Sequence, residues 1–358
     1  MQLTIKTSVL QDMVGKAIKC SSNNKLIPIT SLMNIKVSNQ VFHLTTTDAT
    51  NYFYVKSAEL VSCEDFEISV LADSFTKLVQ KTTSDTITLD YSSNVLKVKG
   101  NGEYTIALPL DENGGPIKFP ATNDIDFSVG CGSINSDAIK SALDYNKNAL
   151  STSLSYPSLL CYYCGDDIIT TNKVKICENK VKAFDEPTLV PGALMELLGV
   201  MSGTINMFKT DKQMIFRTEL ECVVSNIITA LEEFPLQAIQ GLINMDMTSS
   251  CVIPKDVILN VLDRLSLFMS SYDNKGIDIY VTNEGLMFKT ASSTGVEVVP
   301  YTDSQNFMEY NCRIDIEMLK EQLSTHTENN IKFYYGNPKI IKLESGSIKQ
   351  VIALMEGK

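Results

Sequence analysis

The stretch TSVLQDMVGKAI, residues 7–18, is the first of six similar amphipathic segments in this chain of 358 residues. Its apolar residues recur at the spacing of one helix face: Val9, Leu10, Met13, Val14, Ala17 and Ile18. The same pattern predicts further helices that begin near Ala72, Ser136, Pro191, Pro254 and Asp315. The starts are about 55 to 65 residues apart, and so regular a period indicates an internal structural repeat.

Between these helices the sequence has the alternation and the turn residues of antiparallel strands. Residues 86–91 and 95–99 alternate on either side of Ser92-Ser93-Asn94, which predicts a tight hairpin. A second hairpin is expected to turn at Asn283-Glu284-Gly285, and a third at Gly336-Asn337. The chain is therefore expected to be α+β, with each helix leading a set of strands.

Six repeats pair into three domains of similar size, each with two helices against antiparallel sheets. The expected boundaries are the polar stretch at Asn123-Asp124 and the segment from Asp246 to Ser250. The domains would thus comprise residues 1–122, 123–246 and 247–358.

The composition is that of a globular protein, with 44% hydrophobic and 20% charged residues. No apolar run is long enough to cross a membrane, and Met1–Lys6 suits a strand better than a signal peptide. A cytoplasmic location is expected, and the nine cysteines then indicate reduced, buried thiols. Cys161 and Cys164 are three apart in a predicted strand, so their side chains would point to opposite faces and bind no metal together.

Nothing in the sequence favours catalysis. Only two histidines exist, His43 and His326, and neither lies near a nucleophile with an orienting acid or in a metal-ligand spacing. No glycine-rich phosphate-binding motif is present. We therefore expect that the chain is not an enzyme and that it has no catalytic residue, metal or cofactor.

Four short segments resemble motifs of one known family, in the same order. They are Ile27-Pro28-Ile29, Thr171-Asn172-Lys173-Val174-Lys175-Ile176, Phe234-Pro235-Leu236-Gln237 and Val351-Ile352-Ala353-Leu354-Met355. Together with the repeat, they make the chain similar to the bacterial beta sliding clamps, the DNA polymerase III beta subunit family. The resemblance implies two chains closed head to tail into a ring that encircles duplex DNA. Such a processivity factor tethers the replicative polymerase and other replication and repair proteins. The divergence of the motifs suggests a phage or prophage origin.

A sliding ring needs cations that attract phosphates without reading sequence. Because the net charge is −11, these cations must be gathered on one surface. Nine lysines on or beside the helices, off their apolar stripes, are the candidates: Lys16, Lys19, Lys25, Lys77, Lys81, Lys140, Lys147, Lys255 and Lys320. For each, a merely solvated helix face is the alternative, and the fourth helix, Gly192 to Gly199, has no basic residue.

The resemblance also implies a pocket for short peptide motifs of the polymerase and the clamp loader. Its lining would be Thr171, Lys175, Ile176, Pro235, Ile239, Val351, Ala353 and Met355. The alternative is that residues 351–355 are only a terminal core strand. The homodimer interface would place Tyr104 and Ile106 against Phe268 and Met269 of a second copy, unless each is simply buried in its own domain.

Two other functions are compatible with these features. A clamp-fold scaffold or decoy could bind clamp-interacting proteins without encircling DNA, which would suit the acidic total and the altered motifs. A sugar- or peptide-binding repeat protein would need an aromatic cleft, and the chain has no Trp. Convergence of the lysines on one surface would favour the clamp over the scaffold.

Overall fold

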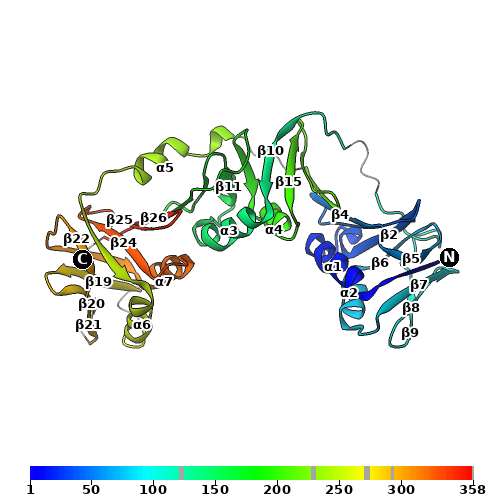
Figure 1. Cartoon of the computed structure of the whole chain (residues 1–358), viewed down its shortest axis with the longest axis horizontal. Helices are drawn as coiled ribbons and strands as arrows, with labels where there is room; N and C mark the ends of the chain where they lie inside the picture. Colours follow the sequence, from blue (N-terminus) through cyan, green and yellow to red (C-terminus); the bar gives the residue numbers. More distant parts are fainter. Residues whose placement is uncertain (121–124, 227–230, 270–274, 292–293, 357–358) are drawn as a thin grey trace. The chain divides into compact units, whose positions relative to one another are not determined.

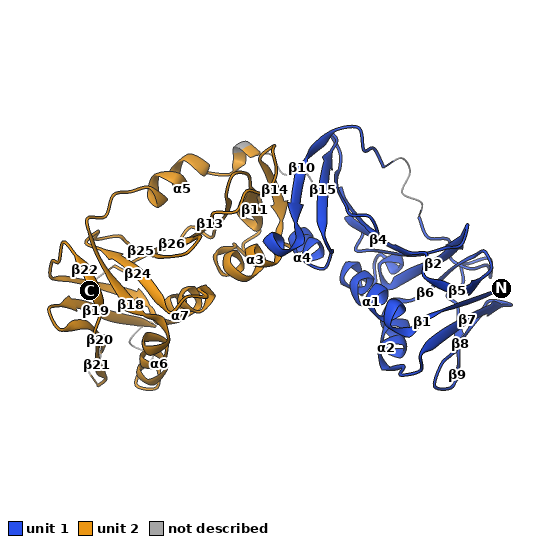
Figure 2. Cartoon of the chain, viewed as in Figure 1, with its two compact units in different colours: residues 1–139, 193–228 blue, residues 140–192, 229–358 orange. Residues whose placement is uncertain are grey.

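The computed structural model describes residues 1–120, 125–226, 231–269, 275–291 and 294–356 (Figure 1). The chain is α+β, and its described part has seven α-helices and four antiparallel sheets. It divides into two compact units, residues 1–139 with 193–228 and residues 140–192 with 229–358 (Figure 2). Among the described helices, none combines the length and the apolar character that crossing a bilayer requires.

Unit 1 contains a five-stranded and an eight-stranded sheet. The first has the order β5 (Leu60–Cys63), β1 (Gln2–Lys6), β7 (Thr86–Ser92), β8 (Val95–Lys99) and β9 (Glu103–Ala107). The second has the order β10 (Gly130–Asn135), β15 (Thr204–Lys209), β16 (Met214–Arg217), β17 (Glu221–Ser225), β4 (Asn51–Ser57), β3 (Val41–Thr47), β2 (Leu32–Ser38) and β6 (Phe66–Leu71). The pairing of β17 with β4 joins strands that are far apart in the sequence.

Unit 2 contains a nine-stranded and a four-stranded sheet. The first has the order β14 (Thr188–Pro191), β11 (Cys161–Cys164), β12 (Ile168–Thr171), β13 (Lys175–Asn179), β26 (Ile348–Ala353), β25 (Ile340–Ser345), β24 (Asn330–Tyr335), β18 (Ser249–Pro254) and β22 (Thr302–Gln305). The second has the order β21 (Val296–Val299), β20 (Gly285–Thr290), β19 (Gly276–Thr282) and β23 (Tyr310–Asp315). The pairing of β13 with β26 brings the C-terminal strand beside the middle of the chain.

The helices bury their apolar stripes and leave the opposite face exposed. Their bounds are α1 (Thr7–Ala17), α2 (Ala72–Lys81), α3 (Ser136–Asn146), α4 (Gly192–Gly199), α5 (Leu236–Ile243), α6 (Lys255–Ser266) and α7 (Ile316–Thr325). In α1, for example, Leu10, Met13, Val14 and Ala17 are buried, as the periodicity of the sequence predicts. Apolar burial of this kind is the main favourable term that holds helix and sheet together.

The six predicted helix starts agree with the structure within one residue. The predicted turn after Ser92 is also confirmed, because Ser93 and Asn94 both have the positive φ of a two-residue hairpin loop. The helix α5 was not predicted, because it lies outside the regular repeat from which the six helix starts were placed.

The three domains predicted from the repeat stay a prediction. The compact units divide the chain after residues 139, 192 and 228, all inside the expected middle domain. The expected boundary at Asn123-Asp124 lies outside the described residues.

Candidate functional site

Six of the nine lysines predicted to contact DNA are exposed. They are Lys19, Lys25, Lys77, Lys81, Lys140 and Lys147. Lys77 forms an exposed ion pair with Asp73, one helix turn away, at 2.7 Å. Exposed pairs of this kind are weak, so that lysine can exchange its partner for a phosphate. The structure therefore leaves these six side chains accessible to a polyanion.

Lys16 differs, because it is only 17% exposed and has two carboxylate partners in unit 1. Its Nζ lies 2.8 Å from Asp12 and 2.8 Å from the buried Glu221. Burial lowers the pKa of Lys16, but its bonds to Asp12 and Glu221 outweigh burial and raise that pKa above its usual value. Glu221 also accepts hydrogen bonds from the backbone of Ser202 and the hydroxyl of Thr218.

Lys255 and Lys320 are likewise half-buried, and the ammonium group of each has a partner within the protein. Lys255 donates a hydrogen bond of 2.8 Å to the backbone carbonyl of His326. Lys320 lies 2.7 Å from Asp263 and 3.6 Å from Glu317. The expected solvent-facing position therefore does not hold for Lys16, Lys255 and Lys320, because carboxylate or carbonyl groups of the protein already bind their ammonium groups. The sequence could not reveal most of these partners, since Glu221, His326 and Asp263 are all far from the lysines along the chain.

The residues predicted to form the partner pocket come together in unit 2. Thr171, Lys175 and Ile176 lie on the hairpin β12–β13, and Ile176 pairs with Val351 of β26. Ile239, on α5, belongs to the same apolar cluster as Ile176 and Val351. These five side chains are buried, whereas Ala353 and Met355 are half-buried and Pro235 is exposed. The apolar part of the predicted pocket is thus filled by the protein's own side chains.

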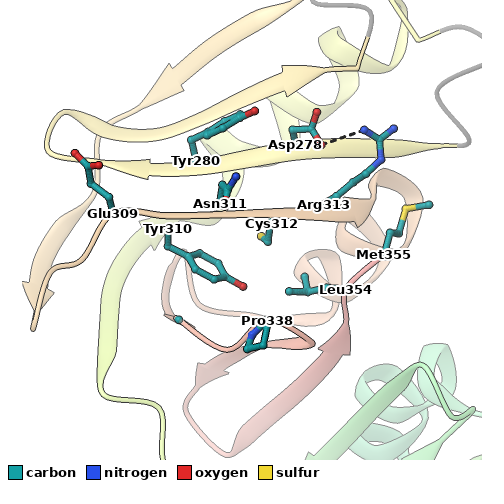
Figure 3. A pocket seen from close by; sticks show the side chains of 11 residues that line it. Asp278, Tyr280, Glu309, Tyr310, Asn311, Cys312, Arg313, Pro338, Leu354 and Met355 are labelled. Carbon is teal, nitrogen blue, oxygen red and sulfur yellow. Dashed lines mark hydrogen bonds and ion pairs between the residues drawn. The ribbon is translucent and has the colours of Figure 1, made fainter. Parts of the chain in front are cut away.

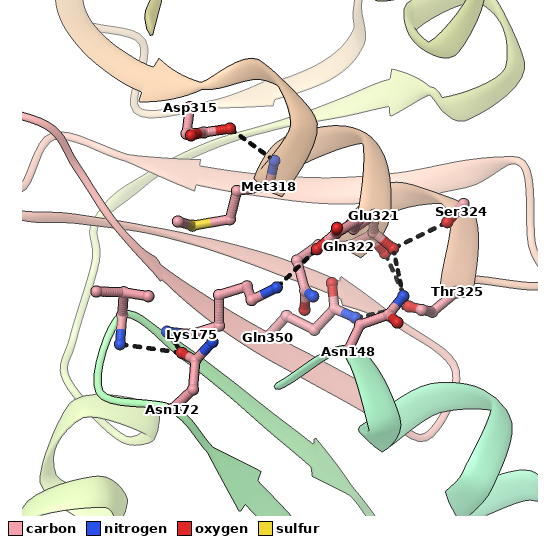
Figure 4. Close-up of polar contacts among 11 residues, drawn as sticks. Asn148, Asn172, Lys175, Asp315, Met318, Glu321, Gln322, Ser324, Thr325 and Gln350 are labelled. Carbon is pink, nitrogen blue, oxygen red and sulfur yellow. Dashed lines mark hydrogen bonds and ion pairs between the residues drawn. The ribbon is translucent and has the colours of Figure 1, made fainter. Parts of the chain in front are cut away.

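The tip of the β12–β13 hairpin is tied to the end of the C-terminal strand. The side-chain oxygen of Asn172 accepts hydrogen bonds from the backbone of Val174 and Lys175. The backbone carbonyl of Val174 accepts one from Ala353, at 2.9 Å. Beside the tip, the buried Lys175 lies 2.7 Å from Glu321 on α7 (Figure 4). The hairpin tip, β26 and α7 therefore hold one another in place.

A cavity of about 550 Å³ lies beside the C-terminal tail of unit 2 (Figure 3). Its lining comprises Asp278, Tyr280, Glu309, Tyr310, Asn311, Cys312, Arg313, Gly336, Pro338, Leu354 and Met355. Arg313 forms an ion pair of 3.0 Å with Asp278, and its backbone carbonyl accepts a hydrogen bond from Met355. The sequence predicted only Met355 of this set, because β19, β23 and the tail converge only in the folded chain.

Burial shifts the pKa of two groups that line this cavity. Burial raises the pKa of the Cys312 thiol to about 12, and burial also raises the pKa of Tyr310. In the part of the chain that the structure describes, no group of three or more His, Cys, Asp or Glu residues is arranged to hold a metal ion.

The residues predicted to join two copies lie on an edge strand and just after a helix. Tyr104 is 44% exposed on β9, the last strand of its sheet, where Ile106 is half-buried. Phe268 is 58% exposed just after α6, and Met269 beside it is half-buried. These positions are accessible to a second copy, and the contact itself stays a prediction.

Comparison with known proteins found one family model and several solved structures that are similar to this chain. Residues 1–113 match the sequence model of the DNA polymerase III beta subunit, N-terminal domain. No curated protein sequence matches the chain. Among solved structures, the DNA polymerase sliding clamp of Bacillus subtilis is 17% identical, with a TM-score of 0.84 and 100% of both chains covered. The beta subunit from DNA polymerase of Streptococcus pyogenes is 15% identical, with a TM-score of 0.86 and 100% of both chains covered.

A third structure, the DNA polymerase III beta subunit of Thermotoga maritima, is 13% identical, with a TM-score of 0.84 and 100% of both chains covered. At such identities the structural likeness establishes the fold, while the sequence match is confined to the first 113 residues. The resemblance seen in the sequence is confirmed at the level of the fold: the chain has the fold of the solved beta sliding clamps, and residues 1–113 match the model of the DNA polymerase III beta subunit, N-terminal domain.

Proposed function

We propose that this chain is a DNA sliding clamp, a homodimeric ring that encircles duplex DNA and tethers a polymerase and other replication or repair proteins to it. The observation that carries the proposal is the full-length likeness to solved sliding clamps, together with six exposed lysines on or beside the helices. Lysines on long side chains attract phosphates regardless of sequence and release them easily, which sliding requires. No catalytic residue and no cofactor form part of this proposal.

The partner site belongs to the same proposal. A short peptide motif of the polymerase or of the clamp loader would bind where the hairpin tip, α5 and the end of β26 meet. Met355 lines the cavity beside the C-terminal tail, and Pro235 just before α5 is exposed, so an incoming peptide could contact either side chain. The remaining predicted residues, being buried, would support that surface from beneath. Cytoplasmic location and phage origin stay predictions.

The test is topological retention on DNA. The purified protein is incubated with nicked circular plasmid at low salt, then separated by gel filtration before and after the plasmid is linearised. A clamp co-elutes with the circle and is lost from the linear form, because it slides off the ends. Retention on both forms would indicate ordinary binding, and absence from both would favour a scaffold that binds clamp partners without encircling DNA.

A charge variant tests whether the exposed lysines contact DNA. Changing Lys19, Lys25, Lys77 and Lys81 to Gln should weaken association with DNA and make it less dependent on salt, by about one unit of slope per lost phosphate contact. The matched control changes four lysines on strands or loops, Lys36, Lys56, Lys97 and Lys118, to Gln. An equal loss in both variants would show that only the total charge matters.

A further inference from the structure

The tip of the β12–β13 hairpin carries a lysine in an unusual setting. Lys173 has a φ of +78°, a left-handed conformation that favours glycine or asparagine over lysine. The turn holds it there, because Thr171 Oγ1 accepts a hydrogen bond from the backbone N–H of Lys173, and Asn172 accepts two from the residues that follow. A lysine at a position that suits glycine suggests a functional role for the Lys173 side chain.

The side chain of Lys173 lies over an aromatic ring. Its Nζ is 2.9 Å from the centroid of the Tyr156 ring. No carboxylate of the described residues pairs with this ammonium, in contrast to the neighbouring Lys175, which is buried against Glu321. The ring face attracts the cation without neutralising it, and at an exposed site such a contact is weak. The charge of Lys173 is therefore available to an incoming anion.

The surroundings of Lys173 are apolar and exposed. Tyr156 is 48% exposed, Val174 is 44% exposed, and Leu154 is almost fully exposed. Val174 also accepts the hydrogen bond from Ala353, so this patch adjoins the end of the C-terminal strand. One accessible cation among exposed apolar side chains fits a peptide that combines apolar residues with an acidic one.

A DNA backbone fits this patch less well. Phosphate tracking needs several cations in succession. Residues 150–157 contain no lysine or arginine, and residues 171–176 contain only Lys173 and the buried Lys175. We therefore expect no phosphate contact at Lys173, and the experiment below would detect one.

We propose that Lys173 determines the specificity of the partner site, and that its ammonium leaves the Tyr156 ring to pair with an Asp or Glu side chain of the bound peptide. The freed ring then becomes a surface for an apolar residue of the same peptide. This inference rests on the proposed function, because it names the chemistry of the partner that the clamp would bind.

The experiment uses labelled hexapeptides and the full-length protein. Each peptide carries two leucines and one phenylalanine, and an Asp is placed in turn at every remaining position, with an Asn peptide as its counterpart. Binding is measured by fluorescence polarisation. The wild type should prefer the best Asp peptide over its Asn counterpart by about threefold to fivefold, as expected for an exposed ion pair.

The decisive variant is Lys173→Gly, which removes the charge and supplies the residue that the left-handed turn favours, so folding should be preserved. It should bind the Asp and Asn peptides equally, whereas Lys173→Arg should keep the preference. The control Lys180→Gln removes an exposed lysine from the other end of β13 and should behave as the wild type.

The possible outcomes distinguish a failure of this inference from a failure of the proposed function on which it rests. If no peptide binds specifically, the partner site of the proposed function fails. If peptides bind with no preference for Asp, or if Lys173→Gly keeps that preference, the function stands and this inference is overturned. A Lys173→Gly variant that loses retention on circular DNA while its peptide binding is unchanged would assign Lys173 to phosphate contact and would also overturn it.

Discussion

At the scale of single residues, the burial of His326 makes the stability of the fold depend on pH. The imidazole is enclosed by Ser345 and Gln350, and burial, together with the nearby Lys255, lowers its pKa to about 4 despite the bond to Gln350. In the unfolded chain this pKa is near its ordinary value of about 6.5. The unfolded state therefore binds more protons between these values, so the stability contributed by neutral His326 is present above pH ~6.5 and lost as the pH falls towards ~4.

We therefore expect His326→Gln to be less sensitive to mild acid than the wild type. Between pH 7 and pH 5 the wild type should lose on the order of 2 kcal/mol of unfolding free energy through this residue. Urea unfolding of both proteins at pH 7 and pH 5 measures the difference. His43→Gln is the control in unit 1: burial also lowers the pKa of His43, but this histidine is less buried. Equal pH dependence in the wild type and His326→Gln would contradict the assignment.

At the scale of elements, α5 depends on a lysine from a strand of the sheet beneath it. Lys342 on β25 donates a hydrogen bond of 2.8 Å to the carbonyl of Ile243, the last residue of α5, and another to the carbonyl of Met245. A cation at the C-terminal end of a helix satisfies carbonyls that have no partner within the helix and also opposes the helix dipole. Burial lowers the pKa of Lys342, which indicates a real desolvation cost that these two bonds offset.

The variant Lys342→Met should loosen α5 by about 1–2 kcal/mol. Hydrogen exchange followed by mass spectrometry should show faster exchange in residues 236–247 and little change in β19 and β20. Lys332→Met, on the neighbouring strand β24, is the matched control, because it removes a lysine that makes a weak bond to Gln305 and a contact with the Tyr334 ring but no bond to α5. Unchanged exchange in residues 236–247 would mean that the apolar contacts of Ile239 and Ile243 hold the helix without the lysine.

At the scale of the whole molecule, the proposed ring requires two copies to meet. If Tyr104 on the edge strand β9 lies in that contact, Tyr104→Glu should weaken dimerisation by roughly thirtyfold or more, because it places an uncompensated charge in a desolvated surface. Light scattering over a range of concentrations should find the wild type near twice 39.6 kDa and the variant near 39.6 kDa.

The opposite edge of the same sheet supplies the control. Val61 on β5 is more exposed than Tyr104, so Val61→Glu adds the same charge to the other edge strand and should leave the dimer intact. If both variants dimerise as the wild type does, β9 does not join the two copies.

The amino-acid sequence alone determined the local features of this fold. The apolar stripe of residues 7–18, the hairpin turn at Ser93-Asn94 and the six helix starts follow from neighbouring residues, since helix periodicity and turn conformation are local properties. The repeat of these elements predicted an α+β chain, and together with the order of four weak motifs it predicted the likeness to the beta clamps. The motifs also gave the candidate partner pocket, whereas the helix faces gave most of the candidate DNA-binding lysines.

Only the tertiary structure decided which candidate side chains are accessible. Lys16 and Lys19 are equivalent in the sequence, yet Lys16 meets Glu221 from a strand about two hundred residues later, while Lys19 stays exposed. Likewise, the pairing of β13 with β26 buries Ile176 and Val351, and places the tail beside a cavity that no local pattern predicts. The physical reason is that ion pairs, strand partners and cavities arise between residues far apart in the chain, whereas helix and turn propensities are set by near neighbours.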